Sequence, residues 1–278
     1  MKTRDFLFVL ATVAVAACAQ TPEERVKAYE EAHDAMIQEY RQMMDSLSND
    51  REKAQAYYDD FVEEYVEFNL KAAKKNPDNE VAVQVLMNLR GLIEDEQALE
   101  IISKMPAEML ENEEVAYLKA GLDARIATAE GKPFVDFTVN SVVGQTRSIP
   151  PQPVYADVKL SDYVGKGKYI LLDFWSPWCG PCRREMPNIK AVYDKYKGDN
   201  FDVVSIAVWE REPVEVTIET AEELGMDWNQ INNGQREPAQ LYGVEGIPHL
   251  ILFGPDGTIL KRGFHGAEIE EVVSSYLK

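Results

Sequence analysis

Apolar residues recur at helical spacing, every third or fourth position, in four stretches of the first half of the chain. The apolar stripes lie at 37–47, 58–68, 85–93 and 115–126. Polar or proline-containing breaks separate the stripes at 48–50, at 76–79 and around Pro106. Thr21-Pro22-Glu23-Glu24 is typical of a helix start, and Asp78 or Asn79 is suited to cap the third helix. Because the long stripes have acidic opposite faces, we predict an antiparallel all-α layer.

The second half of the chain has the pattern of alternating strands and helices. Residues 169–174 are apolar or aromatic except for Asp173, as expected of a strand buried on both faces. Gly144 and three prolines make 139–154 a loop or an irregular hairpin. Further strands are expected at 201–208, 249–253 and 258–262, with helices after Cys182 and at 214–224, 239–242 and 267–277. This order predicts an α/β fold with a mixed central sheet flanked by helices.

The charge balance is strongly acidic. Aspartate and glutamate number 48 against 29 lysine and arginine residues, for a net charge of −19. The acidity is concentrated in 19–130, with 26 acidic and 12 basic residues, whereas 131–278 has 21 and 15. Such a balance argues against nucleic-acid binding and against charge-driven docking on anionic lipid. Solvated helix faces account for most of it.

The first residues resemble an export signal. Lys2 and Arg4 precede an apolar run, 6–17, that is too short for a comfortable membrane span. The run ends in Val15-Ala-Ala-Cys18, which resembles a bacterial lipoprotein signal, where the cysteine is acylated and becomes the first residue. The alternative is an ordinary secretory peptide cut near Cys18. We therefore predict a signal peptide over 1–17 and a lipid-anchored protein facing the periplasm.

The remaining two cysteines stand where a strand ends and a helix begins. Unpartnered N–H groups and the macrodipole at a helix N-terminus stabilise a thiolate, so Cys179 is expected to ionise readily. Two intervening residues allow Cys182 to close a small disulfide ring, and Pro181 stiffens the turn. We assign Cys179 as the attacking thiolate and Cys182 as the resolving thiol.

The motif Trp178-Cys-Gly-Pro-Cys182 resembles the active site of thioredoxins. Asp173, Pro187 and Gly246-Ile-Pro-His249 match further thioredoxin positions, and 131–138 and 160–163 resemble the lead-in of the exported TlpA-like branch. The resemblance covers 131–278 and implies a thioredoxin fold there. The preceding helical segment looks like that of Bacteroidota TlpA-like lipoproteins. The predicted organisation is a signal peptide (1–17), an acidic helical domain (18–130) and a thioredoxin-like domain (131–278).

The resemblance implies a thiol:disulfide oxidoreductase. Asp173 is expected to have a raised pKa and to exchange the proton of Cys182. Pro248 is expected in cis, with the backbone of Ile247 pairing with an extended substrate chain. Trp178 offers a flat apolar surface near the sulfurs, or is a packing residue. His249 is expected to be structural rather than to tune the thiolate.

Gly-Pro between the cysteines is the dipeptide of reducing thioredoxins, so a reductase is favoured. The expected partners are proteins with disulfides and a membrane electron donor of the DsbD type. No metal and no cofactor is predicted, and His33 is expected on the surface of the first helix. The helical domain is either a spacer and cover or a client-binding surface.

Two alternatives remain. A thiol peroxidase shares the lead-in and places its reactive Cys after a Pro and a Thr that activate peroxide, but here Ser176-Pro-Trp178 precedes Cys179 and no Thr lies nearby. A lipid-anchored binding or chaperone module would use the helical domain as its working surface.

Overall fold

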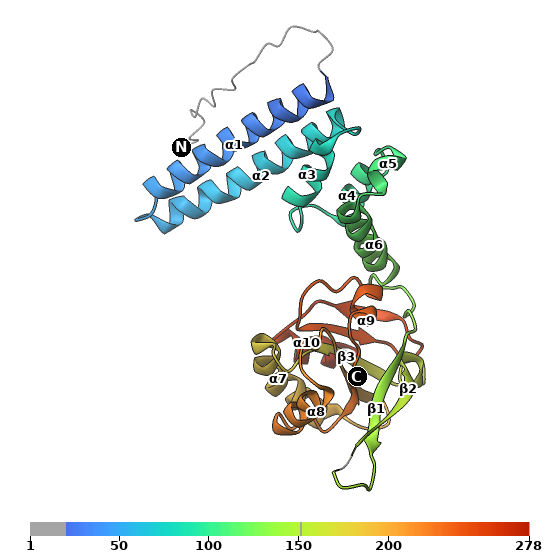
Figure 1. Cartoon of the computed structure of the whole chain (residues 1–278). Helices are drawn as coiled ribbons and strands as arrows, with labels where there is room; N and C mark the ends of the chain where they lie inside the picture. Colours follow the sequence, from blue (N-terminus) through green and yellow to red (C-terminus); the bar gives the residue numbers. More distant parts are fainter. Residues whose placement is uncertain (1–20, 151, 278) are drawn as a thin grey trace. The chain divides into compact units, whose positions relative to one another are not determined.

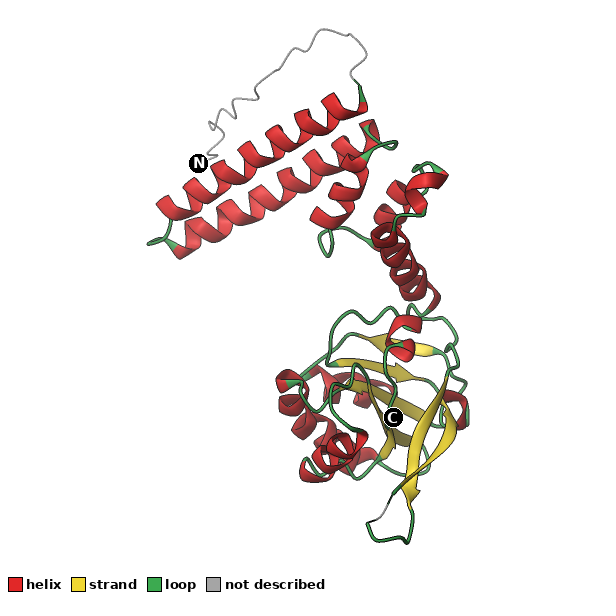
Figure 2. Ribbon diagram, viewed as in Figure 1, coloured by secondary structure: helices red, strands yellow, loops and turns green. Residues whose placement is uncertain are grey.

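The computed structural model of the chain describes residues 21–150 and 152–277, shown in Figures 1 and 2. The predicted signal peptide and the predicted lipidation site Cys18 lie outside these residues. The chain divides into two compact units, Met1–Val115 and Ala116–Lys278, which are described separately below. The division falls within one helix, earlier than the predicted domain boundary at 130/131. No helix within the described ranges has the length and apolar character needed to cross a membrane.

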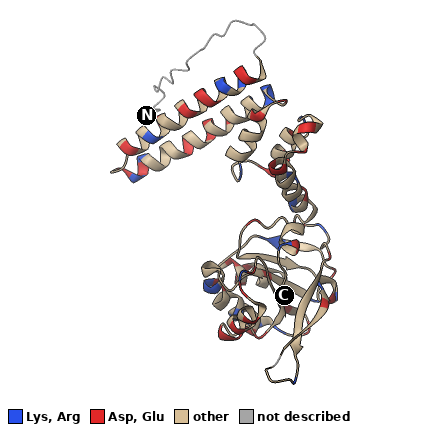
Figure 3. Cartoon of the chain, viewed as in Figure 1, with Lys and Arg blue, Asp and Glu red and all other residues tan. Residues whose placement is uncertain are grey.

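The first unit begins with a long helical hairpin formed by α1 (Pro22–Ser46) and α2 (Arg51–Lys75). Thr21 and Glu24 form a capping box at the start of α1, and the Asp50 side chain caps α2. The two helices run antiparallel (Figure 1). Their inner faces meet through stacked aromatic rings. Tyr40 and Phe61 are the closest pair, with ring centroids 4.2 Å apart. Acidic residues recur along both helices (Figure 3).

Shorter helices complete the helical part of the chain. They are α3 (Glu80–Asn88), α4 (Asp95–Ile102), α5 (Ala107–Leu110) and α6 (Glu113–Ala127). Asn79 caps α3 through a hydrogen bond from Val81 N, which confirms one of the two predicted caps. Val81, Ala82 and Val85 of α3 are fully buried and anchor it to the core. The predicted all-α character of this region is confirmed.

His33 is half-buried rather than fully on the surface, where we predicted it. Its side chain is 19% exposed, and Nε2 lies 3.0 Å from the Tyr65 hydroxyl and 3.3 Å from Asn88 Nδ2. The neighbouring Tyr29 hydroxyl donates to Asn69 Oδ1 at 2.6 Å. A partly buried polar cluster therefore joins α1, α2 and α3. Each member satisfies another, which is what burial of polar groups requires.

The second unit contains a five-stranded mixed sheet with strand order β5-β4-β3-β6-β7. The central strand β3 runs parallel to β4 and antiparallel to β6. The strands are β3 (Tyr169–Trp175), β4 (Phe201–Ala207), β5 (Asn229–Ile231), β6 (His249–Phe253) and β7 (Ile259–Arg262). A separate hairpin pairs β1 (Thr138–Gln145) with β2 (Pro153–Lys159), with a bulge near Gly144, so the predicted irregular hairpin is confirmed.

Helices cover both faces of this sheet. One apolar cluster joins alternate residues of β3, Leu171 and Trp175, to α7 (Gly180–Tyr196), α8 (Val214–Glu223) and α10 (Glu268–Tyr276). The other joins the intervening β3 residues, Leu172 among them, to α9 (Glu237–Leu241), β1 and the 3-10 turn at Leu160–Asp162. This is the predicted thioredoxin-like architecture, and the strand alternation decides which face each side chain of β3 joins.

Candidate active site

The two motif cysteines lie together where β3 passes into α7. Cys179 is the N-cap residue of α7, and a disulfide joins it to Cys182 with the two Cα atoms 5.3 Å apart. The backbone N–H of Cys182 donates to Cys179 Sγ at 3.1 Å. Cys179 is 3% exposed and Cys182 is fully buried, so Cys179 is the less buried of the two residues.

The start of α7 favours negative charge on sulfur. Its first turn contains no acidic residue, and the exposed Arg183 and Arg184 follow Cys182 directly. The helix N-terminus contributes further positive potential at Cys179. On reduction, we expect these groups to stabilise the Cys179 thiolate over the thiol. The predicted roles of attacking and resolving cysteine remain a prediction that fits this geometry.

Asp173 lies fully buried in the middle of β3. It stands between Leu171 and Trp175, so it points to the same face of the sheet as the apolar cluster that contains both cysteines. Ser205 Oγ of β4 donates to Asp173 Oδ2 at 2.8 Å, and Trp228 Nε1 donates to Ser205 Oγ at 2.8 Å. Asp173 Oδ1 has no hydrogen-bond partner among the described residues.

Burial raises the pKa of Asp173 from 3.8 to about 7. The Ser205 hydrogen bond lowers this pKa in part, and the negative charge of Glu185 raises it. A carboxyl group that titrates near neutral pH can both accept and return a proton under ordinary conditions. The buried Asp173 therefore suits the predicted exchange with the Cys182 thiol.

The segment facing the disulfide contains a cis peptide bond between Ile247 and Pro248, as the sequence predicted. The carbonyl oxygen of Ile247 lies 3.6 Å from Cys179 Sγ. A disulfide sulfur carries no proton, so this approach is a contact rather than a hydrogen bond. Both residues therefore lie where an extended chain could pair beside the sulfurs, which is the role predicted for them.

Trp178 is 38% exposed, and its ring is held in place. Its Nε1 donates to the carbonyl of Trp209 at 2.9 Å, and the Arg211 guanidinium lies 3.8 Å from the ring centroid. One face of the ring is therefore stacked against a cation, in a geometry that stabilises both groups. The predicted apolar platform is in part covered, and its contact with substrate stays a prediction.

His249 opens β6 and is mostly buried. Burial lowers its pKa to about 4, and the positive charges of Arg262 and His265 add to this effect. Arg262 Nη2 lies 3.4 Å from His249 Nε2. A neutral imidazole adds no positive charge near the thiolate at neutral pH, which favours the structural role over tuning of Cys179.

The sequence reasoning missed three residues of this site. Ser205 and Trp228 form the hydrogen-bonded chain to Asp173, and Glu185 is a buried carboxylate on α7 that accepts from Gly266 N at 3.0 Å. A hydroxyl in the apolar run of 201–207 was the available signal for Ser205. Trp228 and Glu185 gave no comparable signal, because aromatic and acidic residues are ordinary in a helix-rich domain.

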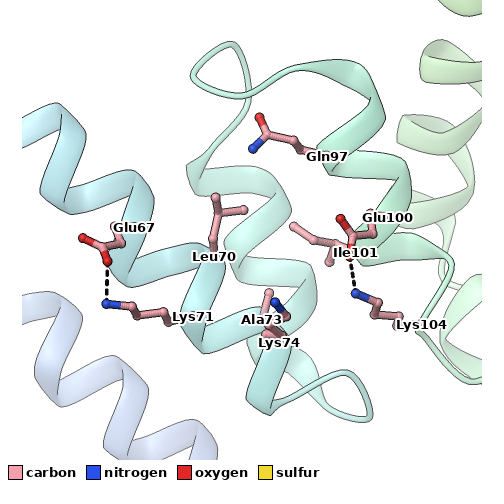
Figure 4. A pocket seen from close by; sticks show the side chains of 9 residues that line it. All are labelled: Glu67, Leu70, Lys71, Ala73, Lys74, Gln97, Glu100, Ile101 and Lys104. Atoms are coloured by element: carbon pink, nitrogen blue, oxygen red, sulfur yellow. Dashed lines mark hydrogen bonds and ion pairs between the residues drawn. The ribbon is translucent and has the colours of Figure 1, made fainter.

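The helical unit contains a cavity of about 220 Å³ between α2 and α4 (Figure 4). Leu70, Ala73 and Ile101 supply its apolar side chains. Two of its lysines are matched by carboxylates, since Lys71 pairs with Glu67 and Lys104 pairs with Glu100. Within the described ranges, no group of three histidine, cysteine or acidic residues could hold a metal ion.

Comparison with known proteins supports the same chemistry. Residues 131–262 match the AhpC/TSA family. The thiol-disulfide oxidoreductases ResA of Geobacillus thermodenitrificans and Geobacillus kaustophilus are 27% and 29% identical over 154 and 150 residues. These alignments cover 55% and 52% of this chain and 79% and 83% of the relatives.

Two solved structures resemble the same half of the chain. The thioredoxin domain of a thiol-disulfide oxidoreductase from Bacteroides vulgatus is 26% identical, with a TM-score of 0.45, and covers 54% of this chain and 99% of its own. A thiol:disulfide interchange protein from Bacteroides sp. is 27% identical, with a TM-score of 0.44, and covers 54% and 91%. Together with the dithiol at the start of α7, the sequence matches show that residues 131–262 form an AhpC/TSA-type thioredoxin-like domain and that the protein is a thiol-disulfide oxidoreductase.

Proposed function

We propose that the protein is a membrane-anchored, extracytoplasmic reductase of disulfides in other proteins, acting through the Trp178-Cys-Gly-Pro-Cys182 dithiol. The observation that carries the proposal is the placement of Cys179 at the N-cap of α7, with the buried Asp173 on the same face of the sheet. A thiolate at a helix N-terminus, a resolving thiol beside it and a proton acceptor are the groups that disulfide exchange uses.

The cycle consists of two exchanges. The Cys179 thiolate attacks one sulfur of a substrate disulfide, forms a mixed disulfide and releases the other substrate sulfur as a thiolate. Cys182 then loses its proton to Asp173 and attacks Cys179, which frees the second substrate thiol and leaves the protein disulfide. Two electrons pass to the substrate in each cycle, so the protein must be reduced again by a donor.

Substitution of each cysteine tests the cycle. Cys179→Ser should abolish turnover, whereas Cys182→Ser should accumulate a mixed disulfide with substrate that a non-reducing gel detects. Full multiple-turnover activity of Cys182→Ser would exclude the assigned roles.

The direction of electron flow rests on the dipeptide between the cysteines. Gly-Pro is the pair found in reducing thioredoxins, so we expect a reduction potential of about −270 mV rather than the value of about −120 mV of a strong oxidant. Equilibration of Cys179 and Cys182 with glutathione or dithiothreitol buffers measures it. A value near the oxidant's would reverse the direction.

The location follows from the N-terminal sequence. Acylation of Cys18 would hold the protein to a membrane without a spanning helix, and a DsbD-type carrier would supply electrons from the cytosolic side. Metabolic labelling with a fatty-acid analogue and cell fractionation test the anchor. Loss of label and of membrane association in Cys18→Ser is the expected result, and unchanged association would reject it.

The geometry favours this proposal over its alternatives. Cys179 Sγ faces the Ile247 carbonyl in a segment suited to an extended polypeptide, which a peroxidase does not need. A peroxide-consumption assay separates the two activities. A binding or chaperone module would not require Cys179, so Cys179→Ser should leave such activity intact.

A further inference from the structure

Two loops beside the active-site tryptophan are held in an unusual backbone conformation. Within the described ranges, the non-glycine residues with positive φ are Trp209, Asn233 and Gln235, at 53°, 67° and 55°. All three belong to the loops that follow β4 and β5. Left-handed backbone is costly for residues with a side chain, and such residues persist only where the surroundings hold them, often at functional sites.

Glu210 ties the two loops together. Its Oε1 accepts from Asn233 N at 2.9 Å and from Thr217 Oγ1 at 3.3 Å, and Oε2 accepts from Gln235 N at 3.5 Å. Trp209 N also donates to the Gln235 carbonyl at 2.8 Å. A carboxylate bound to this many donors fixes the backbone on both sides of it.

The close approach of the loops leaves no room for a side chain at Gly234. A side chain there would begin 2.5 Å from the Ala207 carbonyl oxygen, to which Gly234 N donates. The pair of loops, defined here as the clamp (208–213 and 232–235), is therefore fixed by backbone hydrogen bonds, packing and one carboxylate.

The clamp positions two side chains at the motif. The carbonyl of Trp209 accepts a hydrogen bond from Trp178 Nε1. Arg211, two residues after Trp209, stacks on the Trp178 ring. Arg211 is exposed on its other side. The strained backbone thus holds a guanidinium group against the residue that directly precedes Cys179.

A second guanidinium lies against Gly180, between the two cysteines in sequence. Arg184 Nη1 is 3.5 Å from the point where a side chain on Gly180 would begin, and Arg184 lines a cavity of about 360 Å³ with Pro181, Glu185, Pro248 and His265. Arg184 and Arg211 form no ion pair with the residues that the structure describes. Arg183 lies 4.0 Å from Glu223 and is in part neutralised.

Arg184 and Arg211 form a positive patch at the motif, in contrast to the acidic balance of the rest of the molecule. The chain has a net charge of −19, yet the residues against Trp178 and Gly180 are arginines without a carboxylate partner. The nearby acids are buried Glu185, clamped Glu210 and exposed Glu212. Arginine's planar, weakly hydrated guanidinium is suited to binding carboxylates.

We propose that Arg184 and Arg211 select substrate disulfides flanked by acidic residues, with the clamp serving to position Arg211. The inference rests on the proposed reductase function and names its substrate class. Carboxylates that flank the substrate disulfide would meet the guanidinium against Trp178 or the one against Gly180. The stacking partner Trp178 limits the conformations of Arg211 before substrate arrives, which reduces the entropy lost on binding.

The test compares two cyclic peptides that share one disulfide and differ only in flanking residues, glutamate in one and lysine in the other. The reduced full-length protein is mixed with each peptide, and acid quench followed by mass spectrometry gives the single-turnover rate. The expected ratio of the glutamate rate to the lysine rate is about five or more at low salt, falling as salt rises. The ratio of the two rates does not depend on the fraction of Cys179 that is thiolate, because both peptides react with the same protein.

Charge reversal identifies the residues. Arg211→Glu and Arg184→Glu should each lower the ratio by about threefold, and the double variant should bring it to one or below. Lys166→Glu is the matched control, since Lys166 is exposed before the other end of β3 and makes the same charge change. It should keep the wild-type ratio.

Glu210 is tested as a positioning residue. Glu210→Ala should lower the ratio, and Glu210→Gln should restore part of it, because glutamine keeps an acceptor oxygen for Asn233 N. A purely structural role would lower the melting temperature without moving the ratio.

The outcomes separate the two proposals. Equal wild-type rates for both peptides, or a ratio unchanged in the double arginine variant, would overturn the acidic preference and leave the reductase function standing. Failure of the wild type to reduce either peptide would overturn the function and, with it, this inference.

Discussion

A carboxyl group in the middle of a buried strand loses the hydration that stabilises its charge. At Asp173 the loss is offset only by the hydroxyl of Ser205, and one carboxylate oxygen has no hydrogen-bond partner among the described residues. The folded protein therefore prefers the neutral form, and the pKa rises to about 7. A buried ionisable group costs stability, and such groups cluster at functional sites, which fits the proton exchange predicted for Asp173.

This preference makes stability depend on pH. The pKa of Asp173 is higher in the folded state than in the unfolded state, so the folded state binds more protons between about pH 4 and pH 7. Wild-type stability should fall as pH rises through that window, by at most about 1.4 kcal/mol per unit. Asp173→Asn should not show this fall. The difference in unfolding free energy between Asp173→Asn and wild type should therefore shift by about 2–3 kcal/mol in favour of the variant from pH 5 to pH 7.

Urea unfolding of the oxidised proteins at several pH values measures the gain. Asp199→Asn, at an exposed position before β4, controls for the loss of one negative charge. Parallel profiles for wild type and Asp173→Asn would contradict the raised pKa.

Ser205 should matter through the same hydrogen-bonded chain. Ser205→Ala leaves Trp228 Nε1 and Asp173 Oδ2 without their partner, which should cost about 1–3 kcal/mol of unfolding free energy. It should also raise the pKa of Asp173 further, because the Ser205 hydrogen bond lowers that pKa. An upward shift in the pH profile of the Cys182 resolution step, measured by single-turnover kinetics, distinguishes this effect from lost packing.

Sequence reasoning succeeded at residues whose chemistry is unusual for their surroundings. Asp173 interrupts an apolar strand, and Cys179 and Cys182 stand at a strand–helix junction, so each was recognisable. It failed where the partner is distant in sequence. Trp228 reaches Asp173 only through Ser205, and the Asn88 contact that helps to bury His33 is 55 residues away. Such contacts depend on tertiary packing that a local pattern does not encode.

At the scale of elements, the C-terminal end of α6 is fastened to the sheet of its own unit. Arg125 Nη1 pairs with Glu245 at 2.8 Å, and Arg262 donates both to the Thr128 carbonyl at 2.8 Å and to the Tyr242 carbonyl at 2.7 Å. Gly243 lies at the centre of this contact. It has a φ of 58°, and a side chain there would begin 2.4 Å from Arg125 Cγ.

Gly243→Ala should therefore destabilise the second unit through both backbone strain and overpacking. We expect a loss of about 2–4 kcal/mol, more than an exposed glycine substitution costs. Gly198→Ala is the control, because nothing lies within 4 Å of its added carbon and its φ is not positive. Thermal unfolding followed by circular dichroism measures both. Equal melting temperatures for the two variants would show that α6 is not held by this contact.

Strands and helices with a clear period were predictable from the sequence. The central strand, the closing hairpin and the helices at 214–224 and 267–277 all formed within a few residues of expectation. The clamp was not predictable, because its left-handed residues are Trp209, Asn233 and Gln235 rather than glycine. The conformation is held by hydrogen bonds to the Glu210 carboxylate, and no turn motif in the sequence predicts these bonds.

At the scale of the whole molecule, the chain contains two compact units, each with its own apolar core. The predicted boundary followed Gly131-Lys-Pro133, where the family resemblance begins. The compact unit begins earlier, at Ala116, because the end of α6 belongs to the packing around Gly243 and Tyr242. A resemblance locates the shared domain, whereas contacts determine how much flanking chain folds with it.

The active-site disulfide lies entirely in the second unit, so reduction should affect the unfolding of that unit. A short disulfide loop restricts the unfolded chain, and the chain-entropy relation gives about 2 kcal/mol for a loop of this size. For a unit of this length, that corresponds to a melting-temperature change of about 4–8 °C. In calorimetry, adding reductant should therefore lower the melting temperature of the second unit and leave that of the helical unit unchanged. The double variant Cys179→Ser/Cys182→Ser should not respond to reductant. A response in both transitions would mean that the two units unfold as one cooperative body.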